Sequence, residues 1–314
     1  MRILCYHGFS VADEHEFRPQ LFISPDTFRR RLRHLSARRY PVIDLAVAVE
    51  DLKSGRNPDR AVVITVDDGF AGTLGVAVPV LQEESMPATV YVTTYYVEHQ
   101  VPVFRLAMQY LFWRALRDGK SALQAVSHLP GGDAPEGRRM WAMIEAGERM
   151  PDESCRDRLL AQVADALAVD TAELESTRKL TLMSPSEVSA LSQAGIDVQL
   201  HTHRHRLPVG DVAALERELD ENQSRLQSMT GKRAWHLCYP SGKFDASQWP
   251  ALQAWGVSSA TTCIPGLNSR NTERMGLKRF LDSEAISDIE FRAEISGFLE
   301  LLRTLRAAIR LKRN

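Results

Sequence analysis

The stretch "AVVITVDDGF" occupies residues 61–70 and changes character halfway along. Residues 61–66 are apolar or β-branched, which is typical of a strand buried on both faces of a parallel sheet. Asp67 and Asp68 follow at once, although two adjacent carboxylates repel each other when both are ionised and neither helps to bury the strand. A nearby cation would relieve that repulsion. The stretch therefore predicts a buried parallel strand that delivers an acidic pair at its end.

Alternating strand-like and helical patterns extend this prediction along the chain. In residues 24–39, Ser24 precedes Pro25 at the first helical position, and apolar residues then recur on one face. Strand–helix–strand alternation predicts a mainly parallel α/β sheet, either open or closed into a barrel. Further strand-like runs lie at 2–6, 87–94, 195–200, 234–239 and 256–262, and another helical pattern lies at 212–231.

The region from 98 to 183 interrupts the alternation. It is rich in helix-forming residues and contains the Gly/Pro loop "LPGGDAPEG" at 129–137. We expect a helical insertion between two strands of the sheet. Its aromatic residues Tyr110, Trp113 and Trp141 fit two interpretations, a helical core or a wall of a substrate groove.

Composition excludes several classes of protein. The 314 residues carry a formal net charge of −1, which argues against nucleic acid as a partner. The four cysteines are far apart and show no CxxC spacing, which argues against a disulfide scaffold and a thiolate zinc site. The first apolar run is too short for a signal peptide or a membrane span. These features predict a cytoplasmic protein; oligomeric state is left open.

The segment "QLHTHRHRLP" at 199–208 places three histidines directly after a predicted strand. His201 and His205 are four residues apart, so a turning chain can direct both imidazoles at one ion. Two neutral imidazoles and a carboxylate form an open site for Zn²⁺ or a similar metal. The alternative is a polar surface loop.

A third segment, "LCYPSGKFD" at 237–245, contains Pro240, Ser241 and Gly242. Proline followed by Ser-Gly predicts a tight turn that can present a backbone N–H group. Taken alone, the segment is equally compatible with an ordinary turn.

Together the three segments resemble the polysaccharide deacetylase (NodB-homology) family. Its blocks T-F-D-D-G, H-[S/T]-x-x-H and P-x-G correspond to residues 65–69, 201–205 and 240–242. The resemblance implies an irregular seven-stranded (β/α) barrel formed by 1–97 and 184–285. Residues 98–183 would then be the helical insertion, and 286–314 a C-terminal basic amphipathic helix.

The resemblance also implies roles for individual residues. Asp68, His201 and His205 would bind a divalent metal, Zn²⁺ in the first place, with Co²⁺, Ni²⁺ and Mn²⁺ as alternatives. Asp67 would be the general base that takes a proton from the attacking water. The backbone N–H of Ser241 would stabilise the oxyanion.

The chain departs from the family pattern at two points. Cys238 stands where many members carry an arginine that orients the base, and we expect Arg279 in "LKRF" to replace it. No histidine follows His236, although the family usually keeps its general acid near the C-terminus. His7, after the first strand, is expected to be that acid; the alternative is a histidine that only hydrogen-bonds to the barrel rim.

These observations lead to one expected function and two alternatives. We expect a metal-dependent hydrolase that removes an acetyl group from an N- or O-acetylated saccharide, an intermediate of surface polysaccharide or glycolipid synthesis. The alternatives are a hydrolase of a non-sugar C–N amide bond and a non-catalytic saccharide-binding protein. The tail 297–314 alternates apolar and basic residues, which predicts peripheral contact with the inner membrane face or a helix docked on the barrel.

Overall fold

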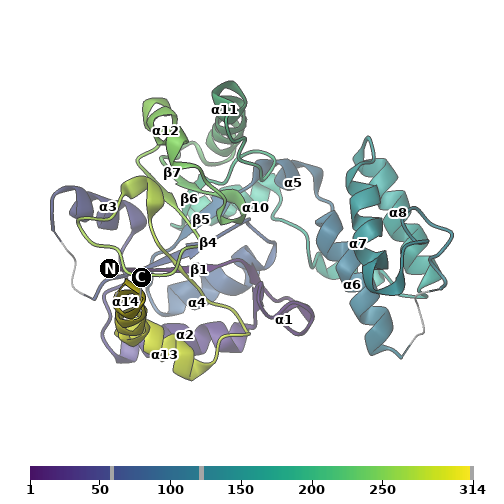
Figure 1. Cartoon of the computed structure of the whole chain (residues 1–314), viewed down its shortest axis with the longest axis horizontal. Coiled ribbons are helices and arrows are strands. Elements are labelled where there is room, and N and C mark those ends of the chain that lie inside the picture. Colours follow the sequence, from purple (N-terminus) through teal and green to yellow (C-terminus); the bar gives the residue numbers. More distant parts are fainter. Residues whose placement is uncertain (57–59, 120–123, 312–314) are drawn as a thin grey trace.

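The computed structural model describes residues 1–56, 60–119 and 124–311. Its strands form one large sheet and one short pair (Figure 1). The strands are β1 (Arg2–Tyr6), β2 (Gly8–Phe9), β3 (Phe22–Ile23), β4 (Val62–Val66), β5 (Thr89–Val92), β6 (Asp197–Leu200), β7 (His236–Cys238), β8 (Ser259–Thr261) and β9 (Phe280–Leu281).

Helices surround the large sheet and also form a separate group beside it (Figure 1). The helices are α1 (Glu14–Phe17), α2 (Pro25–Ala37), α3 (Leu45–Lys53), α4 (Val78–Glu83), α5 (Thr94–His99), α6 (Phe104–Arg117), α7 (Glu136–Glu148), α8 (Glu153–Ala166), α9 (Ala172–Thr177), α10 (Pro185–Gln193), α11 (Val212–Thr230), α12 (Trp249–Trp255), α13 (Asp288–Ser296) and α14 (Phe298–Leu311).

The large sheet has seven strands in the order β8-β7-β6-β5-β4-β1-β9, and every neighbouring pair is parallel. β1 and β4 are buried along their whole length, as continuous apolar runs in a covered parallel sheet should be. Tyr6 is in register with Val66. His7 and Asp67, the next residues, therefore emerge side by side at one end of the sheet.

The sheet curls so that its two edges approach each other. An isolated parallel bridge joins Thr261 at the end of β8 to Leu277, three residues before β9. The result is a curled half-barrel, and the expected irregular seven-stranded (β/α) barrel is confirmed. Because all strands run the same way, their carboxyl ends lie at one rim, where α/β barrels assemble their sites.

The helix α2 shows how local sequence fixes this architecture. Ser24 accepts a hydrogen bond from the Thr27 N–H, and Pro25 occupies the first turn. The side chains of Phe28, Leu32 and Leu35 are fully buried on one face. The predicted amphipathic helix at 24–39 is therefore present, at Pro25–Ala37.

Helices α6 to α9 lie between β5 and β6 in the chain and stand to one side of the barrel (Figure 1). A buried polar cluster ties this group to the barrel. The Lys179 ammonium donates to Asp13 at 2.9 Å and to the Tyr110 hydroxyl of α6 at 2.6 Å. The helical group is thus held where it can border the carboxyl-end rim. The division of the chain into barrel, insertion and tail stays a prediction.

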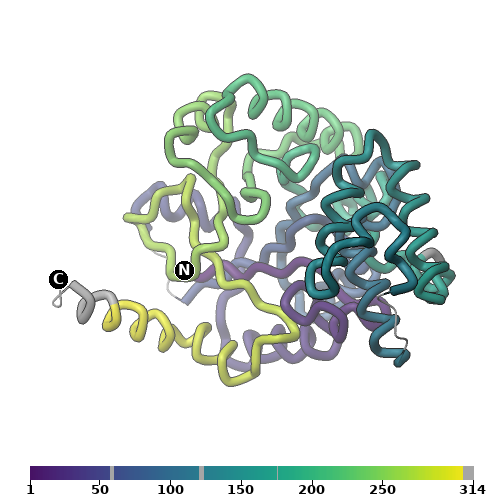
Figure 2. Tube along the Cα trace, turned by 45° about the vertical axis from the view of Figure 1, so that its right-hand side comes forward, coloured from purple at the N-terminus to yellow at the C-terminus, as the bar shows by residue number. Residues whose placement is uncertain are grey.

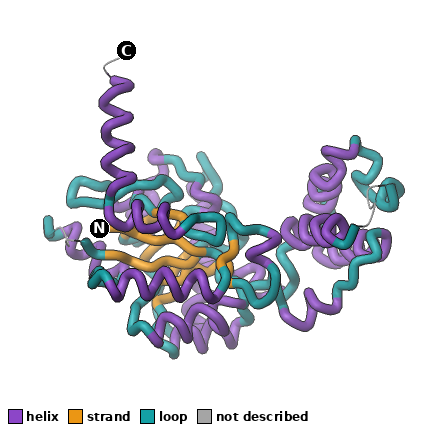
Figure 3. Tube along the Cα trace, turned by 90° about the horizontal axis from the view of Figure 1, so that it is seen from below, coloured by secondary structure: helices purple, strands orange, loops and turns teal. Residues whose placement is uncertain are grey.

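The last helix, α14, projects from the body of the protein (Figures 2 and 3). Three of its apolar side chains are about half exposed, namely Phe298 (54%), Leu301 (56%) and Leu305 (50%). Lys312 and Arg313, which belong to the predicted basic tail, lie outside the described residues. Throughout the ranges that the structure describes, no helix combines the length and the apolar character needed to cross a membrane.

Candidate active site

The carboxyl ends of four strands of the parallel sheet deliver polar side chains to one cavity. His7 follows β1, Asp67 and Asp68 follow β4, His201 and His205 follow β6, and Ser241 follows β7; all of them line the cavity. Parallel pairing of these strands explains why residues separated by more than a hundred positions meet.

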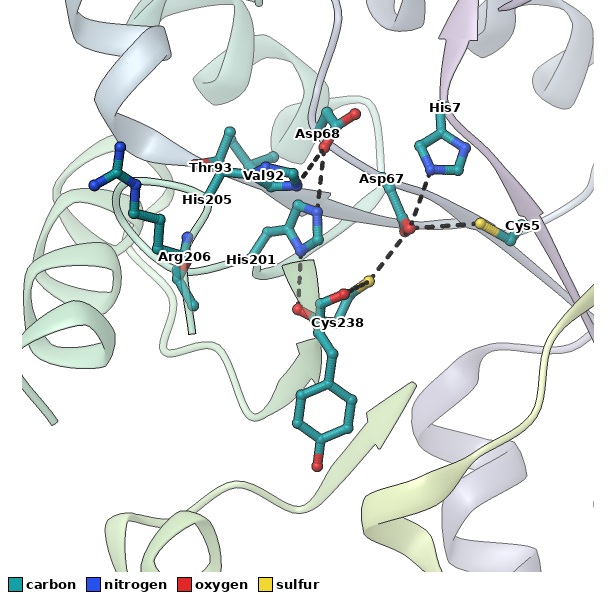
Figure 4. Close-up of polar contacts among 12 residues, drawn as sticks. Cys5, His7, Asp67, Asp68, Val92, Thr93, His201, His205, Arg206 and Cys238 are labelled. Carbon is teal, nitrogen blue, oxygen red and sulfur yellow. Dashed lines mark hydrogen bonds and ion pairs between the residues drawn. The ribbon is translucent and has the colours of Figure 1, made fainter. Parts of the chain in front are cut away.

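Asp68, His201 and His205 converge on a single point. The Asp68 Oδ1 atom lies 3.2 Å from His201 Nε2 and 3.3 Å from His205 Nε2 (Figure 4). One ligand atom from each residue lies within 4.8 Å of the other two. One carboxylate and two imidazoles form a donor set that suits Zn²⁺ and similar ions and leaves further coordination positions free.

The second nitrogen of His201 is fixed by the fold. Its Nδ1 lies 2.9 Å from the backbone carbonyl oxygen of Cys238 (Figure 4). A carbonyl only accepts, so Nδ1 carries a proton, and Nε2 is the nitrogen turned toward Asp68. Burial opposes ionisation of His201, but Cys238 and Asp68 raise its pKa well above the ordinary value. Positive charge is thus favoured beside the Asp68 carboxylate, and a divalent metal bound there would supply it in place of the proton on Nε2.

The backbone around these side chains is held in the left-handed region. Asp68 has φ of 68°, His205 of 54° and Ser241 of 57°. Non-glycine residues adopt such angles at a cost of about 1–3 kcal/mol each, and they cluster where function requires the geometry. Gly69 turns sharply as well, with φ of 90° and its N–H donating to the Asp67 carbonyl at 2.8 Å.

Asp67 does not take part in the meeting of Asp68, His201 and His205. Both of its carboxylate oxygens accept from the Arg279 guanidinium, at 2.6 and 2.7 Å, and neither residue is more than 2% exposed. Burial alone would raise the pKa of Asp67, but the charge and hydrogen bonds of Arg279 hold it well below the usual range. Arg279 is anchored in turn to the Thr262 carbonyl at 2.9 Å.

Two thiols complete the surroundings of Asp67. Cys238 Sγ lies 3.2 Å and Cys5 Sγ 3.4 Å from Asp67 Oδ2 (Figure 4). The Cys238 sulfur also accepts from Arg279 at 3.1 Å. The sequence analysis did not place either thiol beside Asp67. The available signal was their position, because each ends a predicted strand next to one of the site segments.

His7 lies on the other side of Asp67. Its Nε2 atom is 3.7 Å from Asp67 Oδ2, and its side chain is 19% exposed (Figure 4). That exposure leaves the ring open to the cavity, where it can exchange a proton with a bound molecule. Ser241 lines the same cavity from the turn after β7.

The middle histidine of the 201–205 segment lies elsewhere. His203 Nδ1 is 2.9 Å from the Thr94 hydroxyl, and its Nε2 is 3.4 Å from Glu221. These contacts anchor the loop against α5 and α11. Desolvation by burial lowers the pKa of His203, so its neutral form is favoured.

The cavity has a volume of about 720 Å³, enough for a ligand larger than a single sugar ring. The helices α6 to α8 contribute Phe104, Arg105, Leu106, Glu148, Glu153 and Arg156 to its wall. The aromatic residues Tyr110, Trp113 and Trp141 do not line it. Tyr110 instead packs in the core with its hydroxyl in the Lys179 cluster.

Comparisons with known proteins agree with this geometry. The model of the family described as polysaccharide deacetylase matches residues 54–260. No curated protein matches the chain in sequence. Among solved structures, the Streptococcus pyogenes deacetylase PplD in complex with acetate is 15% identical with a TM-score of 0.62, covering 94% of this chain and 97% of that one. IcaB from Ammonifex degensii is 16% identical with a TM-score of 0.59, covering 94% and 95%.

A de-N-acetylase from Aggregatibacter actinomycetemcomitans is 15% identical with a TM-score of 0.58, covering 93% of this chain and 98% of the other. At such identities these likenesses establish the fold. The family-model match is independent of them and contains the acidic pair, the histidine segment and the Pro-Ser-Gly turn. Since it also spans well over half of the sequence, the chain belongs to the polysaccharide deacetylase family, whose members are hydrolases of acetylated saccharides.

Proposed function

We propose that the protein is a metal-dependent deacetylase of an N- or O-acetylated saccharide that serves as an intermediate in surface polysaccharide or glycolipid synthesis. The observation that carries the proposal is that two adjacent carboxylates have different partners. Asp68 faces His201 and His205, whereas Asp67 is held by Arg279. Hydrolysis of an amide or ester needs both a binding site for the electrophilic centre and a separate proton acceptor.

Asp68, His201 and His205 would hold the metal, which we propose to be Zn²⁺. When bound, such an ion polarises the acetyl carbonyl and makes a water molecule more acidic. The donor set and the fixed orientation of His201 support this assignment.

Asp67 would accept the proton of the attacking water. Because Arg279 depresses its pKa, the carboxylate stays ionised at working pH but is a weak base. Arg279 also fixes both carboxylate oxygens, so Asp67 needs no reorganisation before it accepts a proton. Arg279 therefore acts as a positioning residue.

His7 would donate a proton to the departing amine or alcohol. Its position on the exposed side of Asp67 supports this role, since the leaving group must face the open cavity. The backbone N–H of Ser241 would stabilise the negative charge that develops on the acetyl oxygen.

Acetate release is the direct test of this proposal. The purified protein should release acetate from at least one member of a panel of acetylated glycans and nucleotide- or lipid-linked sugars. Chelation should abolish release, metal should restore it, and Asp67→Asn should remove it while metal content stays the same. Acetate release that is unchanged by chelation would contradict the proposal.

The same assay with small non-sugar amides added, together with a saccharide-binding measurement, separates the two alternative functions. Release from a small non-sugar amide, with none from saccharides, would favour a hydrolase of a different C–N bond. Saccharide binding that survives Asp67→Asn, with no acetate release by any form, would favour a non-catalytic binding protein.

We further propose that α14 brings the enzyme to an anionic membrane surface. The half-exposed apolar residues Phe298, Leu301 and Leu305 project from the body, and the sequence from 299 onward is rich in arginine and lysine. Full-length protein should co-sediment with vesicles that contain anionic lipid, and a chain ending at Gly297 should not. Equal sedimentation of both forms, or of neither, would contradict this part.

A further inference from the structure

Two cations in the cavity wall lack the protein partners that the other cations of the wall possess. Arg105 pairs with Glu148 at 2.7 Å, Arg156 with Glu153 at 3.0 Å, and Arg204 with Glu218 at 2.8 Å. Arg206 and Lys243 line the same cavity, and neither side chain has a hydrogen-bond or ion-pair partner anywhere in the described part of the chain. Both residues are exposed to solvent at the mouth of the cavity.

The fold holds the backbone of these two residues in place. Arg206 follows His205 directly, and its backbone N–H donates to the Thr202 hydroxyl at 3.1 Å. Lys243 leaves the turn after β7, in which Gly242 has φ of 66°. A Cβ atom at Gly242 would lie 2.7 Å from Cys263, so this turn packs tightly against its neighbour. The two charges therefore rise from well-defined loops on the adjacent strands β6 and β7.

The two carboxylates at the centre of the site are engaged by other residues and do not neutralise these cations. Both cations line the cavity and are exposed, so each can turn toward an anion bound there. Asp67 offers no compensation because Arg279 engages both of its oxygens. Asp68 faces His201 and His205. With a divalent ion on those three residues, the cavity carries excess positive charge.

We propose that Arg206 and Lys243 form an anion subsite that recognises a phosphate or diphosphate ester on the acetylated saccharide. Two cations from separate loops match a group that bears close to two negative charges and three terminal oxygens. A single carboxylate would be satisfied by one guanidinium. The inference rests on the proposed function, which it narrows to glycosyl phosphates and diphosphates.

The position of Arg206 suggests where the ester group lies. In Figure 4 the group formed by Asp68, His201 and His205 lies between Arg206 on one side and His7 on the other. A phosphate on the carbon next to the acetylated one would thus extend away from the proton donor. A sugar with its acetamido group at C2 and its phosphate at the anomeric carbon satisfies this geometry.

The subsite is tested by measuring how sugars bind to the metal-free protein. Metal is left out because phosphate would itself bind to the ion. Calorimetric titration would compare N-acetylglucosamine 1-phosphate with N-acetylglucosamine and with a corresponding uronic acid. We expect the phosphorylated sugar to bind at least about tenfold more tightly than either, with an advantage that shrinks as salt increases. Thermal unfolding of each protein would verify that it is folded.

Substitutions assign the effect to the two side chains. Arg206→Gln and Lys243→Gln should each remove most of the preference for the phosphorylated sugar. Arg217→Gln is the matched control, because Arg217 is exposed on α11 and lies outside the cavity wall. Equal binding of phosphorylated and neutral sugar, or a preference that survives both substitutions, would overturn the subsite; a preference for the uronic acid would also overturn it.

Acetate release by the metal-loaded enzyme then identifies the source of the phosphate. Faster release from a nucleotide diphosphate sugar, or from a sugar on a short polyprenyl diphosphate, than from a neutral oligosaccharide supports the subsite and names its ligand. Faster release from the neutral oligosaccharide contradicts it. Absence of release from every saccharide would refute the proposed function, while the binding titrations would still decide whether the subsite exists.

Discussion

Asp67 and Arg279 form a buried ion pair whose strength can be measured by a double-mutant cycle. The guanidinium donates to both carboxylate oxygens, at 2.6 and 2.7 Å, and both side chains are withdrawn from water. Asp67→Asn would leave the Arg279 charge without its counterion, and Arg279→Met would do the same to Asp67. Each single change should lower the free energy of unfolding by about 3–5 kcal/mol.

The double variant should be less destabilised than the sum of the two single variants. Both charges are then absent, so no unpaired ion is buried, although the contact of Arg279 with the Thr262 carbonyl is also lost. We expect a coupling free energy of about 2–3 kcal/mol. The contact between Arg279 and Thr262 is lost whenever Arg279 is replaced, whichever residue stands at position 67. Its contribution therefore cancels from the coupling free energy.

Urea unfolding of the metal-free proteins, followed by circular dichroism, would provide the measurement. The dependence of the unfolding free energy on urea must be similar in all four proteins for the cycle to be valid. The control cycle is Glu98→Gln with Arg225→Met, an ion pair of 2.9 Å whose side chains are each about a third exposed. Its coupling should stay below about 1 kcal/mol. Additive effects at Asp67 and Arg279 would refute our account of how the site is held.

Three further outcomes follow from the geometry. His205→Ala should lose most of its bound divalent ion in metal analysis after dialysis against Zn²⁺, and full occupancy would argue against the proposed ligand set. His7→Gln should slow acetate release by about 10²–10⁴-fold with metal content unchanged; wild-type rates would exclude His7 as the acid. Burial, aided by the Lys53 charge, lowers the pKa of His236 to about 4, so the unfolded state takes up its proton first as pH falls from 6.5. The unfolding free energy should therefore fall by about 3 kcal/mol more between pH 7 and 4 in wild type than in His236→Asn, and parallel curves in urea titrations would contradict this.

Local sequence patterns were sufficient to predict individual strands and helices of the fold. The β-branched run at 61–66 is fully buried in β4, and the Ser24 cap with Pro25 starts α2. These features depend on neighbours in sequence, through strand burial and helix capping. The meeting of Asp68 with His201 and His205 followed from family resemblance and from the rule that parallel strands share a rim; their catalytic roles stay predictions.

Contacts made across the barrel could not be deduced in the same way. Arg279 was expected beside the base only through the family resemblance. It lies just before a strand of two residues, too short to leave a periodic pattern, and its contact with Asp67 depends on how the sheet curls. The positions of Cys5 and Cys238 beside Asp67 depend on the same curvature. Only the structure shows that the other cations of the cavity wall have acidic partners while Arg206 and Lys243 have none among the described residues.

Asp67 and Arg279 are 212 residues apart, so during synthesis Asp67 leaves the ribosome well before Arg279. At about 5–20 residues per second, a nascent chain carries the unpaired carboxylate for roughly 10–40 s. Closing a core over an unpaired charge is unfavourable, so strands β1 to β8 alone should leave this end of the barrel open to water. A chain that lacks β9 and Arg279 therefore cannot close this end of the barrel around Asp67 without burying an unpaired charge.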